Sequence, residues 1–174
     1  PTRSWCEASH AADHFAAGSA ETGLQLLRNQ SAASDAKLMK ANSISLFLGS
    51  STYIPGLPLA PSSRSFLMRD GGKNGQGNSK PLPALSLKLA PLLELLKTAY
   101  RAFASAKFAD SEAALREIVT TIPLVAAASR SEVTDIKELL DISREYITAI
   151  RVKAAIGAAA GDTTRSLELA AYFT

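Results

Sequence analysis

The first part of the chain has the hydrophobic pattern of a helical hairpin. From Ser9 to Arg28, apolar residues alternate with polar residues at helical spacing, and Gly18-Ser19 interrupts the pattern. Beyond this break, Leu24 and Leu27 lie three residues apart, so they share one face of a helix. We therefore expect two short antiparallel helices within residues 1–40.

A longer helical region is predicted over residues 81–174. Leucine and aromatic residues recur there at intervals of three and four, namely at Leu85, Leu89, Leu92, Leu93, Leu96, Tyr100 and Phe103. Further on, Ser129 and Glu132 have the spacing of a capping box in front of another apolar stripe. Residues 157–162 interrupt this stripe, and one more helix is expected to begin near Ser166.

Between these regions the pattern changes to that of a β-hairpin. Ile44, Leu46 and Leu48 alternate with serines, which is the period of a half-buried strand. The segment PGLPLAPSS that follows indicates a turn, because proline cannot donate to a strand ladder, and SFLMR supplies a second apolar run. We expect a β-hairpin with a proline-rich tip over residues 41–70, and then a flexible glycine-rich loop over residues 71–80.

These elements predict a mainly α fold made of tetratricopeptide-like or solenoid helical pairs with a projecting β-hairpin. Composition agrees, because 47% of the residues are hydrophobic but only 6% are aromatic, and alanine-rich helices pack closely. The 174 residues fit one helical domain overall. Because the chain lacks an initial methionine and ends on the apolar run AAYFT, we expect a fragment of a longer chain.

Charge and cysteine content narrow the functional classes. The formal net charge is only +3 and the basic residues are scattered, which argues against a nucleic-acid-binding surface. Cys6 is the single cysteine, so an intramolecular disulfide is excluded and a reducing compartment is favoured. Since no apolar run is long enough for a transmembrane segment or a secretory signal, we expect a soluble cytoplasmic protein.

Candidate catalytic and metal-binding motifs are weak. His10 and His14 have the spacing of a two-ligand metal half-site, but zinc needs more ligands, and ordinary helical histidines are the better interpretation. The glycine-rich segment is not a phosphate-binding loop, because Asn78 and Ser79 stand where lysine and serine or threonine are required. We therefore predict no enzymatic activity, no metal and no cofactor, and an enzyme with an unfamiliar site is the least favoured alternative.

The predicted hairpin raises an energetic question. A lone two-stranded hairpin is marginally stable in water, and this one carries many large apolar side chains. Each such side chain contributes about 1.5–3 kcal/mol when it is fully buried. The hairpin could lie flat on the helices of its own chain or be buried in a partner. We favour the partner, because helices of the same chain can cover only one of its faces.

Residues 99–125 are similar to a tetratricopeptide helical pair. Ala106 precedes the second helix at a position where glycine is usual, and Ser111 stands where alanine is usual. Leu115 and Ile118 mark the apolar face of the second helix, and Pro123 ends it. The pattern indicates packing of two antiparallel helices through small residues.

A more specific resemblance covers most of the chain. Seven segments in this order resemble the C-terminal region of the coatomer alpha subunits (alpha-COP): AADHFAAGSAETGLQLL, STYIPGLPLAP, PLPALSLKLAPLLELL, AYRAFASAKF, IVTTIPLV, EVTDIKELLDISREYI and ELAAYFT. The resemblance implies a structural subunit of the COPI coat in Golgi-to-ER and intra-Golgi vesicle transport. It also implies a cytoplasmic protein that is peripheral on Golgi membranes and COPI vesicles.

The resemblance implies partners as well. They are other coatomer subunits and epsilon-COP, a tetratricopeptide protein that in this family encircles a hairpin of alpha-COP. Carried over to the hairpin predicted here, the contacts with epsilon-COP are Leu46, Phe47, Leu48, Tyr53, Ile54, Leu57, Leu59, Phe66 and Met68. The alternative is an unrelated helical-repeat adaptor module that binds a peptide on its helical surface.

Overall fold

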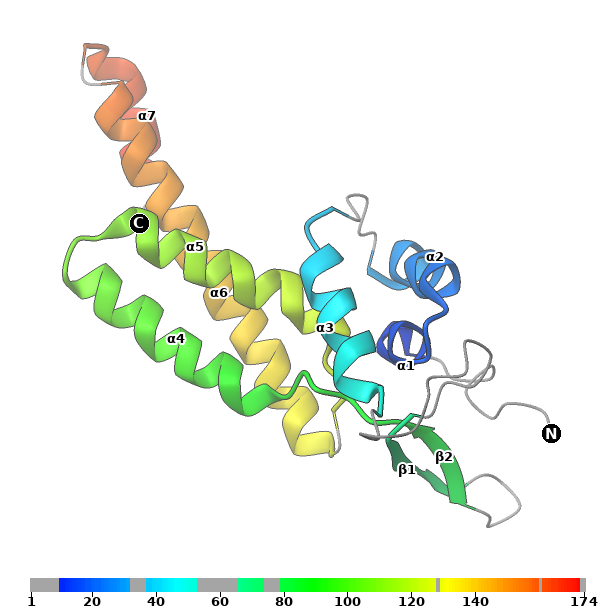
Figure 1. Ribbon diagram of the computed structural model, residues 1–174. Helices are drawn as coiled ribbons and strands as arrows, with labels where there is room; N and C mark the ends of the chain where they lie inside the picture. The colour runs from blue at the N-terminus through cyan, green and yellow to red at the C-terminus, as the bar shows by residue number, and fades with distance from the viewer. Residues whose placement is uncertain are drawn as a thin grey trace. The chain divides into compact units, whose positions relative to one another are not determined.

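The computed structural model describes residues 10–31, 37–52, 66–73, 79–127, 129–159 and 161–172 (Figure 1). Its elements are α1 (Ala11–Ala16), α2 (Ala20–Ser31), α3 (Lys40–Ser50), β1 (Met68–Lys73), β2 (Ser79–Pro83), α4 (Leu89–Ala104), α5 (Phe108–Thr121), η2 (Ile122–Leu124), α6 (Arg130–Ala158) and α7 (Thr163–Ala171). Helices dominate, and the described strands form one two-stranded sheet. The prediction of a mainly α fold with a β-hairpin is therefore confirmed.

The chain divides into two compact units. The first comprises residues 1–88 and 123–126, and the second comprises residues 89–122 and 127–174. The first unit contains α1 to α3 and the β-hairpin, whereas the second contains α4 to α7.

In the first unit, α1 and α2 form the predicted helical hairpin. Gly18 adopts a left-handed conformation with a φ of 84°. Its N–H donates to the carbonyl of Phe15 at 3.0 Å, and the N–H of Ser19 donates to the carbonyl of His14 at 2.8 Å. These two bonds form a Schellman motif, which ends a helix at a residue with positive φ. The predicted break at Gly18-Ser19 is confirmed.

The core of the first unit lies where α1, α2 and α3 meet. Its buried apolar residues are Ala11, Ala12, Phe15, Leu27, Met39, Leu46 and Leu124. Leu85 and Leu87 pack against this core and do not belong to α4, so the predicted helical stripe begins too early. The helix begins at Leu89 because Pro91 is tolerated only in a first turn.

The strand predicted to begin at Ser43 is wrong, because residues 40–50 form helix α3. Alternating Ile44, Leu46 and Leu48 also satisfies helical spacing, since positions four apart lie on one helix face. Packing decides between strand and helix, because the helix buries both Leu46 and Ser50. The predicted proline-rich tip lies in residues 53–65, outside the described residues.

The observed β-hairpin is displaced toward the glycine-rich segment that we expected to be a flexible loop. β1 and β2 pair antiparallel, with Met68 opposite Pro83 and Arg69 opposite Leu82. Both strands are edges, and edge strands tolerate proline. The register shifts between Asp70 and Lys73, an irregularity that accommodates the glycines between them. Within residues 71–80, the described positions 71–73 and 79–80 are therefore strand.

The second unit is built on α4, α5 and α6, which pack against one another (Figure 1). Its buried residues include Leu92, Ala99, Ser111, Leu115, Ile118, Leu139, Ser143 and Ile150. The hydroxyl of Ser111 donates to the carbonyl of Ala99 at 3.0 Å. A serine can therefore replace the usual alanine at this close helix contact, because its polar atom is satisfied.

Of the predicted helix starts in the second unit, that of α6 is confirmed, and α7 begins at Thr163, three residues before the predicted start near Ser166. The side chain of Ser129 accepts a hydrogen bond from the N–H of Glu132 at 3.2 Å, so it caps α6 as the sequence indicated. α7 follows the interruption at residues 157–162 and is capped by Asp162, which accepts from the N–H of Arg165 at 3.1 Å.

The turn between α4 and α5 repeats the turn between α1 and α2, but with alanine in place of glycine. Ala106 has a φ of 59°, and its N–H donates to the carbonyl of Phe103 at 3.0 Å. The N–H of Lys107 donates to the carbonyl of Ala102 at 2.9 Å, which completes a second Schellman motif. The tetratricopeptide-like pattern favours glycine at this position because glycine adopts a positive φ without steric cost.

Replacing Ala106 by glycine is expected to raise the free energy of unfolding by about 0.5–1 kcal/mol. An L-residue in the left-handed region costs about 1–2 kcal/mol, of which part is offset by the greater freedom of glycine in the unfolded chain. The exposed methyl group of Ala106 contributes little burial. Urea denaturation followed by circular dichroism measures the change, and a loss of stability would contradict it.

The matched control for this variant is Gly18→Ala. This substitution introduces the strain that Ala106→Gly removes, and a Cβ atom at Gly18 would lie 3.0 Å from Cε2 of Phe47. We expect Gly18→Ala to lower stability by more than about 1 kcal/mol.

Glu112 of α5 pairs with one arginine of its own helix, Arg116, and with one of α6, Arg151. Its Oε1 accepts from Nη2 of Arg116 at 2.7 Å and from Nε of Arg151 at 3.0 Å. These hydrogen bonds, that of Arg116 foremost, lower the pKa of the Glu112 carboxyl below its ordinary value.

The lowered pKa predicts a pH dependence. The pKa of Glu112 in the folded chain lies below its pKa in the unfolded chain. The hydrogen bonds from the two arginines therefore stabilise the fold fully above the unfolded pKa of Glu112. This stabilisation is lost as the pH falls through the folded pKa. We expect NMR titration of the Glu112 carboxyl carbon to give a pKa below that of a model glutamate. Arg151→Gln should raise this pKa, and an unchanged titration would contradict the role of Arg151.

Candidate functional site

The predicted contacts Leu46, Phe47 and Leu48 occupy three different environments on α3. Leu46 is 0% exposed and belongs to the core of the first unit. Phe47 is half-buried, and its ring packs over Gly18. Leu48 is 64% exposed. Of these three side chains, Leu48 is therefore the most available to a partner.

Two of the remaining predicted contacts, Phe66 and Met68, lie at the start of the β-hairpin. Phe66 is half-buried, whereas Met68 at the start of β1 is 52% exposed. Four further residues lie outside the described residues, namely Tyr53, Ile54, Leu57 and Leu59. They remain predictions from the sequence.

Backbone pairing brings the end of α3 and the start of β1 together. Ser51 forms an antiparallel bridge with Phe66, and the N–H of Leu67 donates to the carbonyl of Ser50 at 2.8 Å. Large exposed apolar side chains occur on both of these segments. They are Ile44, Leu48, Leu67 and Met68, which we call the apolar surface of the first unit.

Sequence reasoning missed Ile44 and Leu67 as candidate contacts. In a strand, Ile44 would lie on the same face as Leu46, so its exposure could not be separated from the burial of Leu46. In a helix, Ile44 and Leu48 share one face because they are four residues apart, and Leu46 faces the opposite way. Helical periodicity at these positions is the signal that could have identified Ile44.

An ion pair attaches the β-hairpin to α1. Nη2 of Arg69 in β1 lies 2.6 Å from Oδ1 of Asp13, whose side chain is only 1% exposed. Nε of the same arginine donates to the carbonyl of Pro83 in β2 at 3.2 Å. Arg69 therefore joins both strands to α1. Sequence reasoning also missed this residue, because its partner lies in another element.

The histidines do not form the metal half-site considered from their spacing. His14 is buried in α1, whereas His10 is exposed at the N-cap of the same helix. Across the described ranges, no three His, Cys, Asp or Glu side chains are grouped as a metal site would require.

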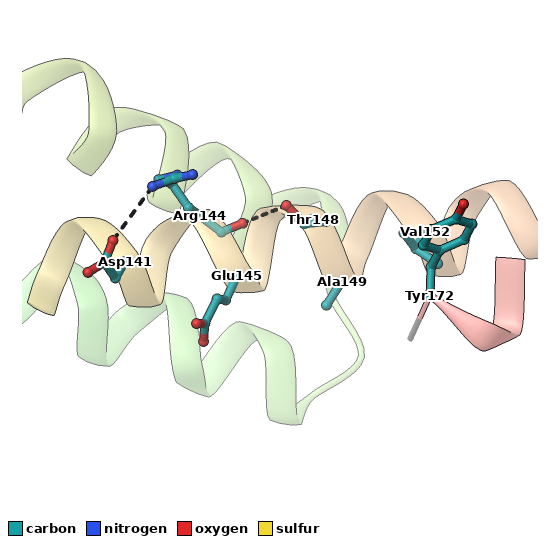
Figure 2. A pocket seen from close by; sticks show the side chains of 7 residues that line it. All are labelled: Asp141, Arg144, Glu145, Thr148, Ala149, Val152 and Tyr172. Carbon is teal, nitrogen blue, oxygen red and sulfur yellow. Dashed lines mark hydrogen bonds and ion pairs between the residues drawn. The ribbon is translucent and has the colours of Figure 1, made fainter. Parts of the chain in front are cut away.

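An open groove of about 650 Å³ lies on the second unit, along α6 and the end of α7 (Figure 2). It is lined by Asp141, Arg144, Glu145, Thr148, Ala149, Val152 and Tyr172. Asp141 pairs with Arg144 at 3.6 Å, and the hydroxyl of Thr148 donates to the carbonyl of Arg144 at 2.8 Å. Both charged partners are well exposed, whereas the charged groups of active sites are commonly buried.

Among the helices that the structure describes, none has both the length and the apolar composition needed to cross a membrane.

Comparison with known proteins gives one consistent family. A family model describing the C-terminus of the coatomer (COPI) alpha subunit matches residues 1–174. Coatomer subunit alpha-3 of Oryza sativa subsp. japonica is 33% identical over 168 residues, covering 97% of this chain and 14% of the rice protein. Coatomer subunit alpha-1 of Arabidopsis thaliana is 33% identical over 174 residues, covering 99% of this chain and 14% of that protein.

A relative from a third organism gives the same result. Coatomer subunit alpha of Dictyostelium discoideum is 33% identical over 171 residues, covering 94% of this chain and 13% of that protein. The chain thus spans only about 14% of the length of the curated relatives that it matches. Because the family model matches the whole chain and these relatives agree with it, the chain belongs to the family formed by the C-terminus of the coatomer (COPI) alpha subunit.

Proposed function

We propose that this chain is part of a structural subunit of the COPI coat and that it binds epsilon-COP through residues 41–70. The protein would act in Golgi-to-ER and intra-Golgi vesicle transport, as a cytoplasmic coat component that is peripheral on Golgi membranes. Membership in the coatomer alpha family supports the coat assignment. The observation that carries the partner assignment is the apolar surface of the first unit.

The apolar surface has the features of a protein interface. Four large apolar side chains on α3 and at the start of β1 are exposed, and exposed apolar side chains mark an interaction site where they form one patch. Leu48 and Met68 belong both to this surface and to the contacts implied by the family resemblance. A tetratricopeptide protein offers a concave surface of the kind that could enclose them.

The alternative of a peptide-binding adaptor is favoured by a different observation, the groove along α6 and α7. That groove is open, and exposed charges of both signs line it. Peptide sites obtain most of their affinity from buried apolar anchors, so the groove is the weaker candidate. The two functions place the essential residues on different units.

A double variant tests the proposal. We expect Tyr53→Asp with Met68→Asp to weaken binding of purified epsilon-COP at least about 100-fold, because interface hot spots contribute about 2 kcal/mol or more each. The change at Met68 places a carboxylate on an exposed position, so the helical circular dichroism spectrum should be retained. Phe47 is avoided because its ring packs over Gly18. Isothermal titration calorimetry measures the affinity.

The matched control is Leu93→Asp on α4, which also places a carboxylate on an exposed apolar position and should leave the affinity unchanged. Equal binding by the double variant and the wild-type chain would refute the assignment. Loss of binding in Glu145→Ala with Val152→Asp, in the α6 groove, would favour the adaptor function instead.

A further inference from the structure

The β-hairpin carries little in its own sequence that fixes how its two strands align. Two of the six residues of β1 are glycines, and two of the five residues of β2 are prolines, which have no N–H to donate. Glycine-rich strands specify their register weakly. The pairing is itself irregular, since the register shifts between Asp70 and Lys73. The alignment of β1 with β2 therefore depends in part on contacts outside the sheet.

The backbone bonds at the base of the hairpin do not select one register either. The N–H of Leu67 donates to the carbonyl of Ser50 at 2.8 Å, and that of Ala84 donates to the carbonyl of Leu67 at 2.7 Å. Every residue other than proline carries the same two backbone groups, so equivalent bonds can form after β1 shifts by one or two residues. Side chains must distinguish the observed register from the shifted ones.

One face of the hairpin packs on α1 and carries Arg69. Strand β2 contacts α1, and its Leu82 is buried. Arg69 lies opposite Leu82 in the pairing, so the two side chains share this face. Met68 and Asp70 lie on the other face of β1, because successive side chains of a strand alternate, and both are exposed. The observed register thus places Arg69 inward and Met68 outward.

Asp13 makes the inward position specific for a cation. Its side chain is 1% exposed, and its Oδ1 lies 2.6 Å from Nη2 of Arg69. Among the described residues, Oδ2 of Asp13 has no hydrogen-bond partner, so the ion pair with Arg69 is the contact that compensates the buried charge. Nε of Arg69 donates to the carbonyl of Pro83 in β2 at 3.2 Å. The same guanidinium therefore relates the position of β1 to both α1 and β2.

A shift of β1 would remove the cation from Asp13. Arg69 is the only basic residue of the sequence between positions 65 and 72. A shift by one residue would bring Met68 or Asp70 to the place of Arg69, and Asp70 would add a second negative charge. A buried carboxylate that loses its cation strongly destabilises the fold. Of these neighbouring registers, only the observed one keeps the charge of Asp13 paired.

We propose that the Asp13–Arg69 ion pair is a register lock, which selects the alignment of β1 with β2 that places Arg69 inward and Met68 outward. Arg69 is thus a positioning residue for the exposed side chains of β1. Apolar residues can often replace a buried ion pair without loss of stability, but they do not distinguish one register from the next by charge. The inference goes beyond the proposed function and concerns the chain alone, so it does not depend on epsilon-COP.

Two variants of the 174-residue chain separate the register from stability, and NMR measures the register through cross-strand nuclear Overhauser effects. In the wild-type chain, residue 69 should contact Leu82 in a single set of resonances. Asp13→Leu with Arg69→Met should keep most of the stability, yet a second set should carry about one tenth or more of the intensity, with cross-strand contacts displaced by one or two residues. Arg69→Lys should be less stable, because it loses the bond to Pro83, but it keeps the cation and should show the wild-type register alone.

A single set of resonances with wild-type cross-strand contacts in the double variant would overturn the register lock. Loss of the single register in Arg69→Lys would overturn it too, because that variant retains the charge. Asp13→Ala with Arg69→Met repeats the deletion of the pair with a small side chain at position 13, so that a poor fit of leucine is not mistaken for a shifted register. Arg144→Met, in an exposed pair on α6, is the control and should leave the hairpin resonances unchanged.

Discussion

Replacing Arg69 by methionine is expected to lower the free energy of unfolding by about 3 kcal/mol. Asp13 is almost completely buried and pairs with Arg69 at 2.6 Å, so the variant leaves a buried carboxylate without its cation. Removing one partner of a buried ion pair typically costs about 3–5 kcal/mol. Methionine keeps most of the aliphatic part of arginine, so the loss reports on the charge more than on packing.

The double variant Asp13→Leu with Arg69→Met provides the decisive comparison. Replacing both members of a buried pair by apolar residues is often neutral, so the double variant should recover most of the stability. Arg144→Met is the matched control, because its partner Asp141 lies 3.6 Å away in an exposed pair and the expected change is below about 1 kcal/mol. Urea denaturation measures all three. A loss in Arg69→Met no larger than in Arg144→Met would contradict the structural role of the buried pair.

Leu46→Ala is expected to lower the free energy of unfolding by about 3 kcal/mol, whereas Leu48→Ala should change it by less than about 0.5 kcal/mol. Leu46 is 0% exposed, and truncating a buried leucine costs the lost burial plus the cavity left behind. Leu48 is mostly exposed, so its truncation removes little contact within the chain. The two residues are two positions apart and differ only in the face of α3 that they occupy.

The same two variants should affect the affinity for epsilon-COP in the opposite order, with the larger loss for Leu48→Ala. Leu48→Ala is expected to weaken binding about tenfold or more, while Leu46→Ala, measured well below its unfolding temperature, should bind nearly as the wild-type chain does. Thermal unfolding and calorimetry on the same two variants give both quantities. Equal stability losses for the two variants would show that α3 is oriented differently.

The long helices were predictable because several local signals agree. The Ser129 cap, the apolar stripe behind it and the break at residues 157–162 all place α6 and α7 where they occur. The start of α4 was less accurate, since Leu85 and Leu87 continue the leucine spacing but pack on another core. Spacing identifies the apolar residues but does not say which core they enter.

The segment around α3 could not be predicted because its pattern fits two structures. Short apolar runs satisfy both strand and helix periodicity, and packing then decides. Here the decisive contact is the hydroxyl of Ser50 on the carbonyl of Ala16, which joins residues 34 positions apart. Similarly, Pro81 and Pro83 argue against a strand until the two-stranded sheet makes them edge positions.

Only part of the candidate site was predicted from the sequence, because the same ambiguity between strand and helix affects the contacts on α3. Leu48 and Met68 are exposed as a partner contact requires, but Leu46 was assigned to the surface because a strand would alternate it with serine. Ile44 was not among the predicted contacts, although a strand would place it on the same face as Leu46. One change of secondary structure thus redistributes the candidate residues between core and surface.

Leu124 has a consequence for the order in which the protein can fold during synthesis. This side chain is 0% exposed and belongs to the core of the first unit, although α4 and α5 separate it in sequence from the rest of that core. A ribosome therefore releases α1, α2, α3 and the hairpin before their last core residue has been made. In contrast, α4 and α5 are neighbours in sequence and can pair as soon as both emerge. The N-terminal unit is thus translated first but completed only after the first helical pair of the second unit is available.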